Sequence, residues 1–125
     1  MSTLTTSKKT IVLGATPNPN RYAYLATQRL KQHGYEAVPV GIREGAIAGI
    51  DIQQGTPYVD EVHTVTLYLN PQRQVPYYDY ILALQPERII FNPGTGNPEL
   101  MKLARDQGIE VSINCTLVML SLGDY

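Results

Sequence analysis

The segment from Thr10 to Tyr22 has the residue types of a phosphate-binding turn between a strand and a helix. Apolar and β-branched residues at 10–13 are followed by Gly14, and a helical pattern begins near Arg21. Glycine lets the backbone turn tightly, and the first N–H groups of a helix attract an anion. The segment therefore predicts a nucleotide-sized ligand site, while a strand-to-helix turn without a ligand fits the same residues.

The dinucleotide-binding fingerprint G-x-G-x-x-G is incomplete, because it requires glycine at Thr16 and Pro19 and only Gly14 is present. The end of the second predicted strand discriminates better between ligands. NAD sites favour an acidic residue there, whereas the guanidinium of Arg43 suits a ribose phosphate through paired, charge-assisted bonds. Glu44 can bind the ribose instead, and an exposed Arg-Glu pair without a ligand is the remaining alternative.

Three further predicted loops carry polar side chains or glycines. Residues 70–74 bring amides and one charge, which suit a pantetheine-like or pyrophosphate group. Residues 92–97 contain two glycines, which allow a ligand close to the backbone, although turn formation explains them as well. Cys115 follows the last predicted strand, where either a buried, inert thiol or one facing the ligand fits.

The residue sets of familiar catalytic and metal sites are missing from the sequence. His33 and His63 stand at a predicted helix end and before a predicted strand, with no metal-ligand spacing around them. We therefore predict no bound metal and no evident catalytic machinery. Cys115 is the single cysteine, which excludes an internal disulfide, and because no signal segment is apparent we expect a cytoplasmic protein.

Length and charge limit the classes of partner. The 125 residues suit one domain, which we expect over 9–125, after a polar, disordered lead-in over 1–8. Ten Lys and Arg against eleven Asp and Glu give a net charge of −1, which argues against nucleic acid. Apolar runs are far shorter than the ~20 residues that span a membrane. Nine tyrosines with one phenylalanine suit a subunit contact, so a homodimer stays open.

Five short apolar runs predict strands that helices cover on both faces. They are Thr10–Gly14, Ala37–Gly41, Thr64–Leu69, Arg88–Phe91 and Ile109–Ile113. Helical patterns lie between them, over Arg21–His33, over Pro76–Leu84, and from Pro98 to Gly108 with Asn97 as the N-cap. Arg43–Glu61 predicts a loop with a short extra element. The alternation predicts an α/β, Rossmann-like three-layer fold with a five-stranded parallel sheet in the order 3-2-1-4-5. Ligands then bind outside the carboxyl ends of the strands.

The chain resembles the small single-domain CoA-binding proteins, which share their fold with the nucleotide-binding domain of the succinyl-CoA synthetase α-subunit. The resemblance runs from Lys9 to the C-terminus. It rests on Gly14-Ala-Thr-Pro-Asn-Pro-Asn-Arg-Tyr22, on His33-Gly-Tyr-Glu-Ala-Val-Pro-Val40, on Pro98-Glu-Leu100 and on Gly108-Ile-Glu-Val111. It implies coenzyme A as the ligand. Because the phosphohistidine and the partner domain of the synthetase are missing, we expect no acyl-CoA ligation by this chain alone.

The resemblance also implies roles for particular residues. Gly14, Thr16, Asn18 and Arg21 correspond to contacts with pyrophosphate or adenosine, and Arg43 stands where related domains offer a basic residue to the CoA 3′-phosphate. Two departures from the family concern Tyr22, which can fill part of the groove, and Gly41-Ile42-Arg43, which replaces an Asn-Pro pair. The candidate ligand contacts are Gly14, Ala15, Thr16, Asn18, Arg21, Tyr22, Gly41, Ile42, Arg43, Asn70, Pro71, Gln74, Asn92, Pro93 and Gly94.

Three functions follow from these observations. The first is a cytoplasmic module that binds CoA or an acyl-CoA and carries out no chemistry of its own. The second is an enzyme, either of an NADP-type nucleotide-binding class or a thiol-transfer protein that uses Cys115. The third is a ligand-free, Rossmann-like protein-interaction domain, because a fold alone does not determine function.

Overall fold

Five four-residue segments, most of them rich in aliphatic and β-branched residues, form a sheet of parallel strands. A computed structural model describes residues 8–125, so the expected lead-in lies, apart from Lys8, outside the described residues. The strands are β1 (Thr10–Leu13), β2 (Ala37–Val40), β5 (Thr64–Leu67), β6 (Arg88–Phe91) and β7 (Glu110–Ile113). Thr10, Thr64 and Arg88 lie side by side in register. Two short strands, β3 (Ala46–Ile47) and β4 (Ile50–Asp51), form a separate antiparallel pair.

The predicted α/β class and the five-stranded parallel sheet are confirmed, but the order of the strands differs from the expected one. The sheet runs β2-β1-β5-β6-β7, so the third long strand lies beside the first instead of outside the second. The segment after β2 explains the difference. Gln53 pairs with the outer edge of β2, where its N–H donates to Pro39 O (2.9 Å) and its carbonyl accepts from Gly41 N–H (2.9 Å). That edge is therefore occupied, and β5 pairs with the free edge of β1.

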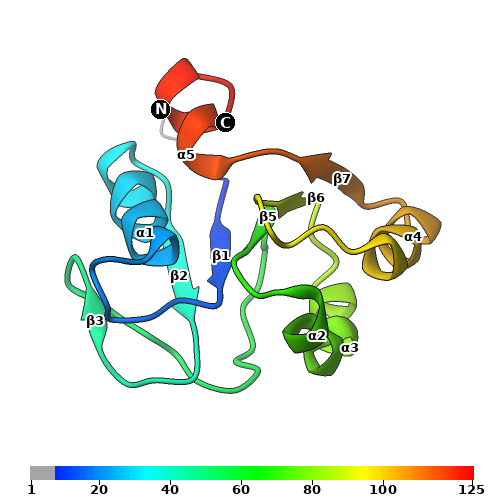
Figure 1. Cartoon of the computed structure of the whole chain (residues 1–125), viewed down its shortest axis with the longest axis horizontal. Helices are drawn as coiled ribbons and strands as arrows, with labels where there is room; N and C mark the ends of the chain where they lie inside the picture. The colour runs from blue at the N-terminus through cyan, green and yellow to red at the C-terminus, as the bar shows by residue number, and fades with distance from the viewer. Residues whose placement is uncertain (1–7) are drawn as a thin grey trace.

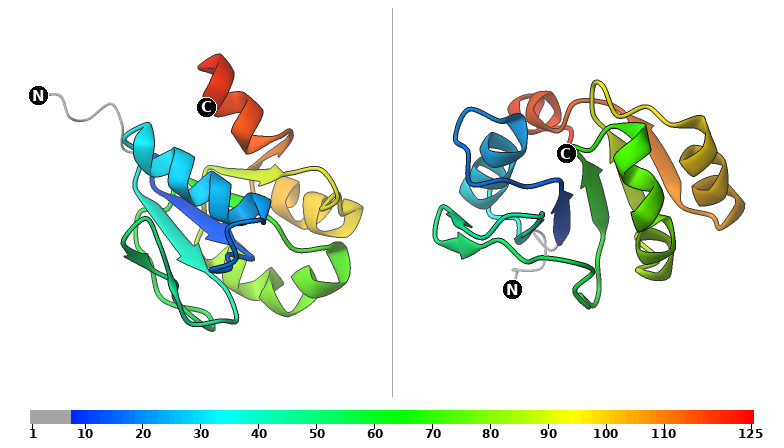
Figure 2. Two further views of the ribbon diagram at one scale, coloured as in Figure 1. Left: turned by 60° about the vertical axis from the view of Figure 1, so that its left-hand side comes forward. Right: turned by 60° about the horizontal axis from the view of Figure 1, so that its bottom comes forward.

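Helices cover both faces of the sheet, as Figures 1 and 2 show. Helices α1 (Tyr22–Gln32) and α5 (Thr116–Leu122) pack on one face, around Val12 and Ile90. Helices α3 (Tyr78–Ala83) and α4 (Pro98–Asp106) pack on the other, around Ile11 and Phe91. Since both faces of each central strand are buried, apolar residues occupy successive positions instead of alternating ones. Within the described part of the chain, no helix is long and apolar enough to cross a membrane.

Helix ends follow local signals in most places. The Asn97 side chain accepts from Leu100 N–H (3.4 Å) and begins α4, as predicted. Residues 70–74 were expected to be a loop, but Asn70 caps a short helix, α2 (Pro71–Gln74), by accepting from Arg73 N–H (2.9 Å). A 3₁₀ turn (Val75–Tyr77) then joins α2 to α3, so the helical region begins before the predicted Pro76.

Candidate functional site

The carboxyl ends of the five parallel strands meet at one edge of the sheet, where five loops lie together. They are residues 14–21 after β1, 41–45 after β2, 68–70 after β5, 92–97 after β6 and 114–115 after β7. Neighbouring strands are ~4.8 Å apart, so the ends of β2 and β7 lie about 19 Å apart. All the candidate contacts predicted from sequence lie on these loops or in the first turns that follow them, and the edge suits an elongated ligand.

The loops after β1 and β2 pack closely against each other at two glycines, where a side chain would not fit. A Cβ on Gly41 would lie 2.0 Å from the carbonyl oxygen of Ala15, and a Cβ on Gly45 would lie 2.7 Å from the Pro17 side chain. The N–H groups of Gly14 and Ala15 both donate to the Val40 carbonyl (2.9 and 3.0 Å). These N–H groups are therefore engaged within the protein, and Gly14, Ala15 and Gly41 give the edge its shape.

The loop before α1 is stabilised by its own side chains. Thr16 Oγ1 accepts from Asn18 N–H (3.3 Å), and Asn18 Oδ1 accepts from Asn20 N–H (3.0 Å). Arg21 is the N-cap of α1 and makes no side-chain capping bond, so no side chain of the cap satisfies the first N–H groups of this helix. Those groups and the helix dipole favour an anion at this end of α1, beside the exposed Tyr22.

Positive charge gathers at this edge although the whole chain has a net charge of −1. Arg21, Arg43 and Arg73 are exposed, and within residues 8–125 none of them forms an ion pair. Glu44 is the single acidic residue in the five loops and α2. The edge can therefore attract an anionic ligand without first breaking salt bridges.

Gln74 links the loop after β5 to the loop after β6. Its side chain is fully buried, and its Nε2 donates to the carbonyls of Leu69 (2.9 Å) and Thr95 (2.8 Å). Its Oε1 accepts from Asn97 Nδ2 (2.8 Å). In this structure Gln74 therefore holds the two loops in place.

Asn92 has a similar structural role at the end of β6, where its side chain links neighbouring elements. Its Nδ2 donates to Thr66 Oγ1 (2.6 Å) and to the Leu67 carbonyl (2.8 Å), while its Oδ1 accepts from Thr116 N–H (2.9 Å). The side chain is buried and joins β5, β6 and α5. The next two residues, Pro93 and Gly94, are exposed, and a Cβ on Gly94 would meet no atom within 4 Å.

Ile42, Asn70 and Pro71 complete the predicted contacts. Asn70 and Pro71 begin α2, where the Asn70 side chain is used as the cap. The Ile42 side chain is exposed beside Arg43 and offers an apolar surface at the β2 end of the edge. The ligand contacts of all these residues stay predictions.

Tyr68 and Cys115 follow β5 and β7 at the same edge of the sheet. Cys115 is half-buried, and its N–H donates to Asn114 Oδ1 (3.0 Å). The Tyr68 hydroxyl is buried and has no hydrogen-bond partner among the described residues, while the neighbouring Thr66 and Thr116 hydroxyls bond to each other (2.7 Å). Burial raises the pKa of Tyr68, so the phenol stays neutral. The sequence counts Tyr68 among the tyrosines that suit a rim or a subunit contact, whereas the structure encloses its hydroxyl.

Solved structures similar to this chain share its whole fold. One crystal structure, of a protein described as uncharacterized, is 55% identical with a TM-score of 0.93, covering 95% of this chain and 98% of the other. A hypothetical protein from Pyrococcus horikoshii OT3 is 24% identical (TM-score 0.81, 92% and 82% covered). The cell-free ID.343 protein from Thermus thermophilus is 23% identical (TM-score 0.83, 94% and 90% covered). The last two likenesses are evidence of fold alone.

Among curated proteins, none matches the chain. The family model described as the CoA binding domain matches residues 8–121. This range includes all five strands, the five loops of the carboxyl edge and most of α5. The chain therefore belongs to the CoA-binding domain family.

Proposed function

We propose that this protein binds coenzyme A, or an acyl-CoA, along the carboxyl edge of its sheet. The observation that carries the proposal is the exposed Arg43 at the end of β2, which forms no ion pair within residues 8–125 and lies on the same edge as the N-terminus of α1. CoA carries anionic groups at two separate places, a 3′-phosphate on its ribose and a diphosphate. Membership of the CoA-binding domain family supports the same ligand.

The positions of the positive groups along the edge indicate the orientation of the ligand, with its 3′-phosphate near β2 and its pantetheine arm toward β7. The 3′-phosphate binds Arg43, because a guanidinium forms two parallel bonds to a phosphate. The diphosphate lies at the loop before α1, where the helix offers N–H groups. The exposed side chains of Tyr22 and Ile42 provide apolar surfaces for the adenine. The pantetheine arm then extends past β5 toward β6 and β7.

The protein acts as a binding module in this proposal. The accessible candidate groups are guanidinium, amide and backbone groups, which bind phosphate but do not by themselves form a general acid–base pair or a nucleophile with its base. The proposed location is the cytoplasm, and a homodimer stays a prediction.

A thiol-transfer enzyme is the second candidate, because the half-buried Cys115 lies on the same edge, where the pantetheine thiol would end. The two candidates differ in a simple measurement. Exchange of Cys115 with CoA disulfide forms a mixed disulfide and releases one CoA thiol, which intact-mass analysis detects as one added CoA. A binding module leaves the mass unchanged.

Thermal unfolding with CoA and with NAD tests the proposed function. A ligand present at ~100 times its dissociation constant stabilises the folded protein by about 2.7 kcal/mol, which raises Tm by several degrees. We expect this shift with CoA and none with NAD, which lacks a phosphate for Arg43. An equal shift with both ligands, or with neither, contradicts the proposal.

A further inference from the structure

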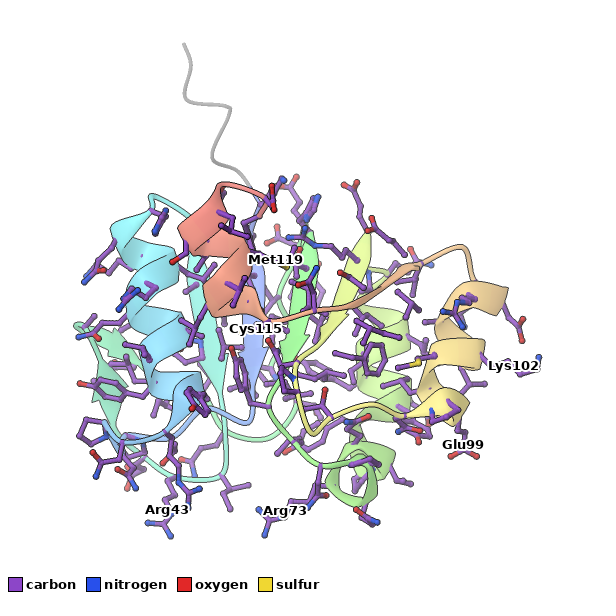
Figure 3. All side chains as sticks on the ribbon, turned by 45° about the horizontal axis from the view of Figure 1, so that its top comes forward. Arg43, Arg73, Glu99, Lys102, Cys115 and Met119 are labelled. Carbon is purple, nitrogen blue, oxygen red and sulfur yellow. The ribbon has the colours of Figure 1, made fainter. Side chains whose placement is uncertain are left out.

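Arg73 is an exposed cation at the carboxyl edge. Its side chain has no structural role in the fold, and the proposed binding of the 3′-phosphate does not use it. It lies on α2, after β5, whereas Arg43 follows β2. Figure 3 shows both labelled side chains projecting from the same side of the molecule. We propose that Arg73, together with the loop before α1, binds the diphosphate of a nucleotide whose ribose phosphate is bound by Arg43. The site then selects nucleotides that carry two separate phosphoryl groups.

The strand order places the two arginines on opposite sides of the loop after β1, which begins at Gly14. β2 and β5 are the two neighbours of β1, so their ends lie about 10 Å apart with the loop after β1 between them. A ribose separates the two anionic groups of such a nucleotide, so a single cation does not bind both. One arginine on each side of this loop provides a separate cation for each anionic group, and the sheet order expected from sequence would not have placed them so.

The backbone that carries Arg73 is held in place. Its N–H donates to Asn70 Oδ1 (2.9 Å) and to the Asn70 carbonyl (3.1 Å). The next residue, Gln74, is the fully buried link between two loops. Binding through Arg73 therefore orders only one side chain, which lowers the entropic cost of forming the contact.

The surroundings of Arg73 leave its charge available. Residues 68–74 contain no acidic side chain, and Arg73 makes no ion pair within the described chain. Arginine presents two parallel N–H donors to a phosphate, which lysine does not. An exposed arginine that only solvates the surface is the alternative explanation, and it predicts no selectivity between anionic groups.

The inference rests on the proposed function and is tested by calorimetric titration of Arg73→Gln with CoA and with 3′-dephospho-CoA. Both ligands carry the diphosphate, so we expect both dissociation constants to rise by the same factor, about 10- to 100-fold for one charged contact. Arg73→Lys should recover part of the loss, because it restores the charge without the paired bonds.

Arg105→Gln is the matched control. Arg105 is exposed in the last turn of α4 and also makes no ion pair within residues 8–125, so the variant removes the same charge away from the carboxyl edge. We expect its binding to equal that of the wild type. Unchanged binding by Arg73→Gln, a loss confined to CoA, or an equal loss in Arg105→Gln overturns the inference alone. Failure of the wild-type protein to bind CoA overturns the proposed function together with it.

Discussion

The carbonyl oxygen of Ala15 occupies the space that a side chain on Gly41 would need, since a Cβ there would lie only 2.0 Å from it. The loops after β1 and β2 therefore approach each other at Gly41, which brings Arg43 close to the loop after β1. No other residue type fits this position without moving one of the two loops.

Gly41→Ala should lower the free energy of unfolding by about 1–3 kcal/mol, the usual cost of forcing an extra group into a packed region. Gly96→Ala is the control, because a Cβ on Gly96 meets no atom within 4 Å and its φ is not in the left-handed region. Urea unfolding should leave Gly96→Ala within ~1 kcal/mol of the wild type. Equal stability of the two variants would show that the close approach is unimportant.

Gln74→Leu should be strongly destabilising, although the two side chains have similar volumes. The change leaves the Thr95 and Leu69 carbonyls without their partner, while the Asn97 amide keeps its bond to the Tyr78 hydroxyl. Each buried group without a partner costs about 1–3 kcal/mol, so for the two carbonyls a total loss on the order of 2–6 kcal/mol is expected. Gln72→Leu, at an exposed position of α2, should change the free energy of unfolding by less than ~0.5 kcal/mol. A stable Gln74→Leu protein would refute the structural link.

The free energy of unfolding should be lower at about pH 5.5 than at about pH 7.5 because of His63. Burial, and then the charge of Arg88, lower the pKa of His63 below its ordinary value of 6.5. The unfolded chain then binds the proton more readily than the folded protein. The free energy of unfolding is therefore highest above pH 6.5 and falls as the pH drops below it. His63→Gln should reduce this fall, while His33→Gln, at an exposed position, should keep it. Urea unfolding at the two pH values measures both, and an unchanged fall in His63→Gln contradicts the assignment.

Arg43→Gln should weaken CoA more than 3′-dephospho-CoA. The proposal assigns the guanidinium to the phosphate that only CoA carries, and one charge-assisted contact contributes about 1.5–3 kcal/mol. Isothermal titration calorimetry of the variant with the two ligands measures the difference. The same loss for both would mean that Arg43 does not bind the 3′-phosphate.

Local signals made much of the fold predictable. The residues of β6 were predicted as they occur, because a continuous apolar run is typical of a strand buried on both faces. The start of α4 followed from Asn97 and Pro98, whose side chains act on the nearest turn. The helix α5 was not predicted. Its seven residues are mostly apolar without a polar face, and its start is held by contacts of Thr116 with Thr66 and Asn92.

Long-range contacts decided the rest. The strand order depends on Gln53, which pairs with Val40 at the outer edge of β2. The two residues are 13 positions apart in the sequence. Gln74 and Asn92 are predicted ligand contacts because they lie in loops at the carboxyl edge, and these contacts stay predictions. Their actual partners are backbone and side-chain groups of other loops and strands, and no local pattern in the sequence reveals such partners.

Binding of CoA along the carboxyl edge of the sheet can be followed residue by residue by backbone amide NMR during a titration with CoA. The amide signals of residues 14–21, 41–45 and 92–97 should shift with CoA concentration and saturate together. Signals of Glu87 and Gly108, at the opposite edge of the sheet, should stay in place. Shifts gathered at that opposite edge, or no shifts in excess CoA, would contradict the account.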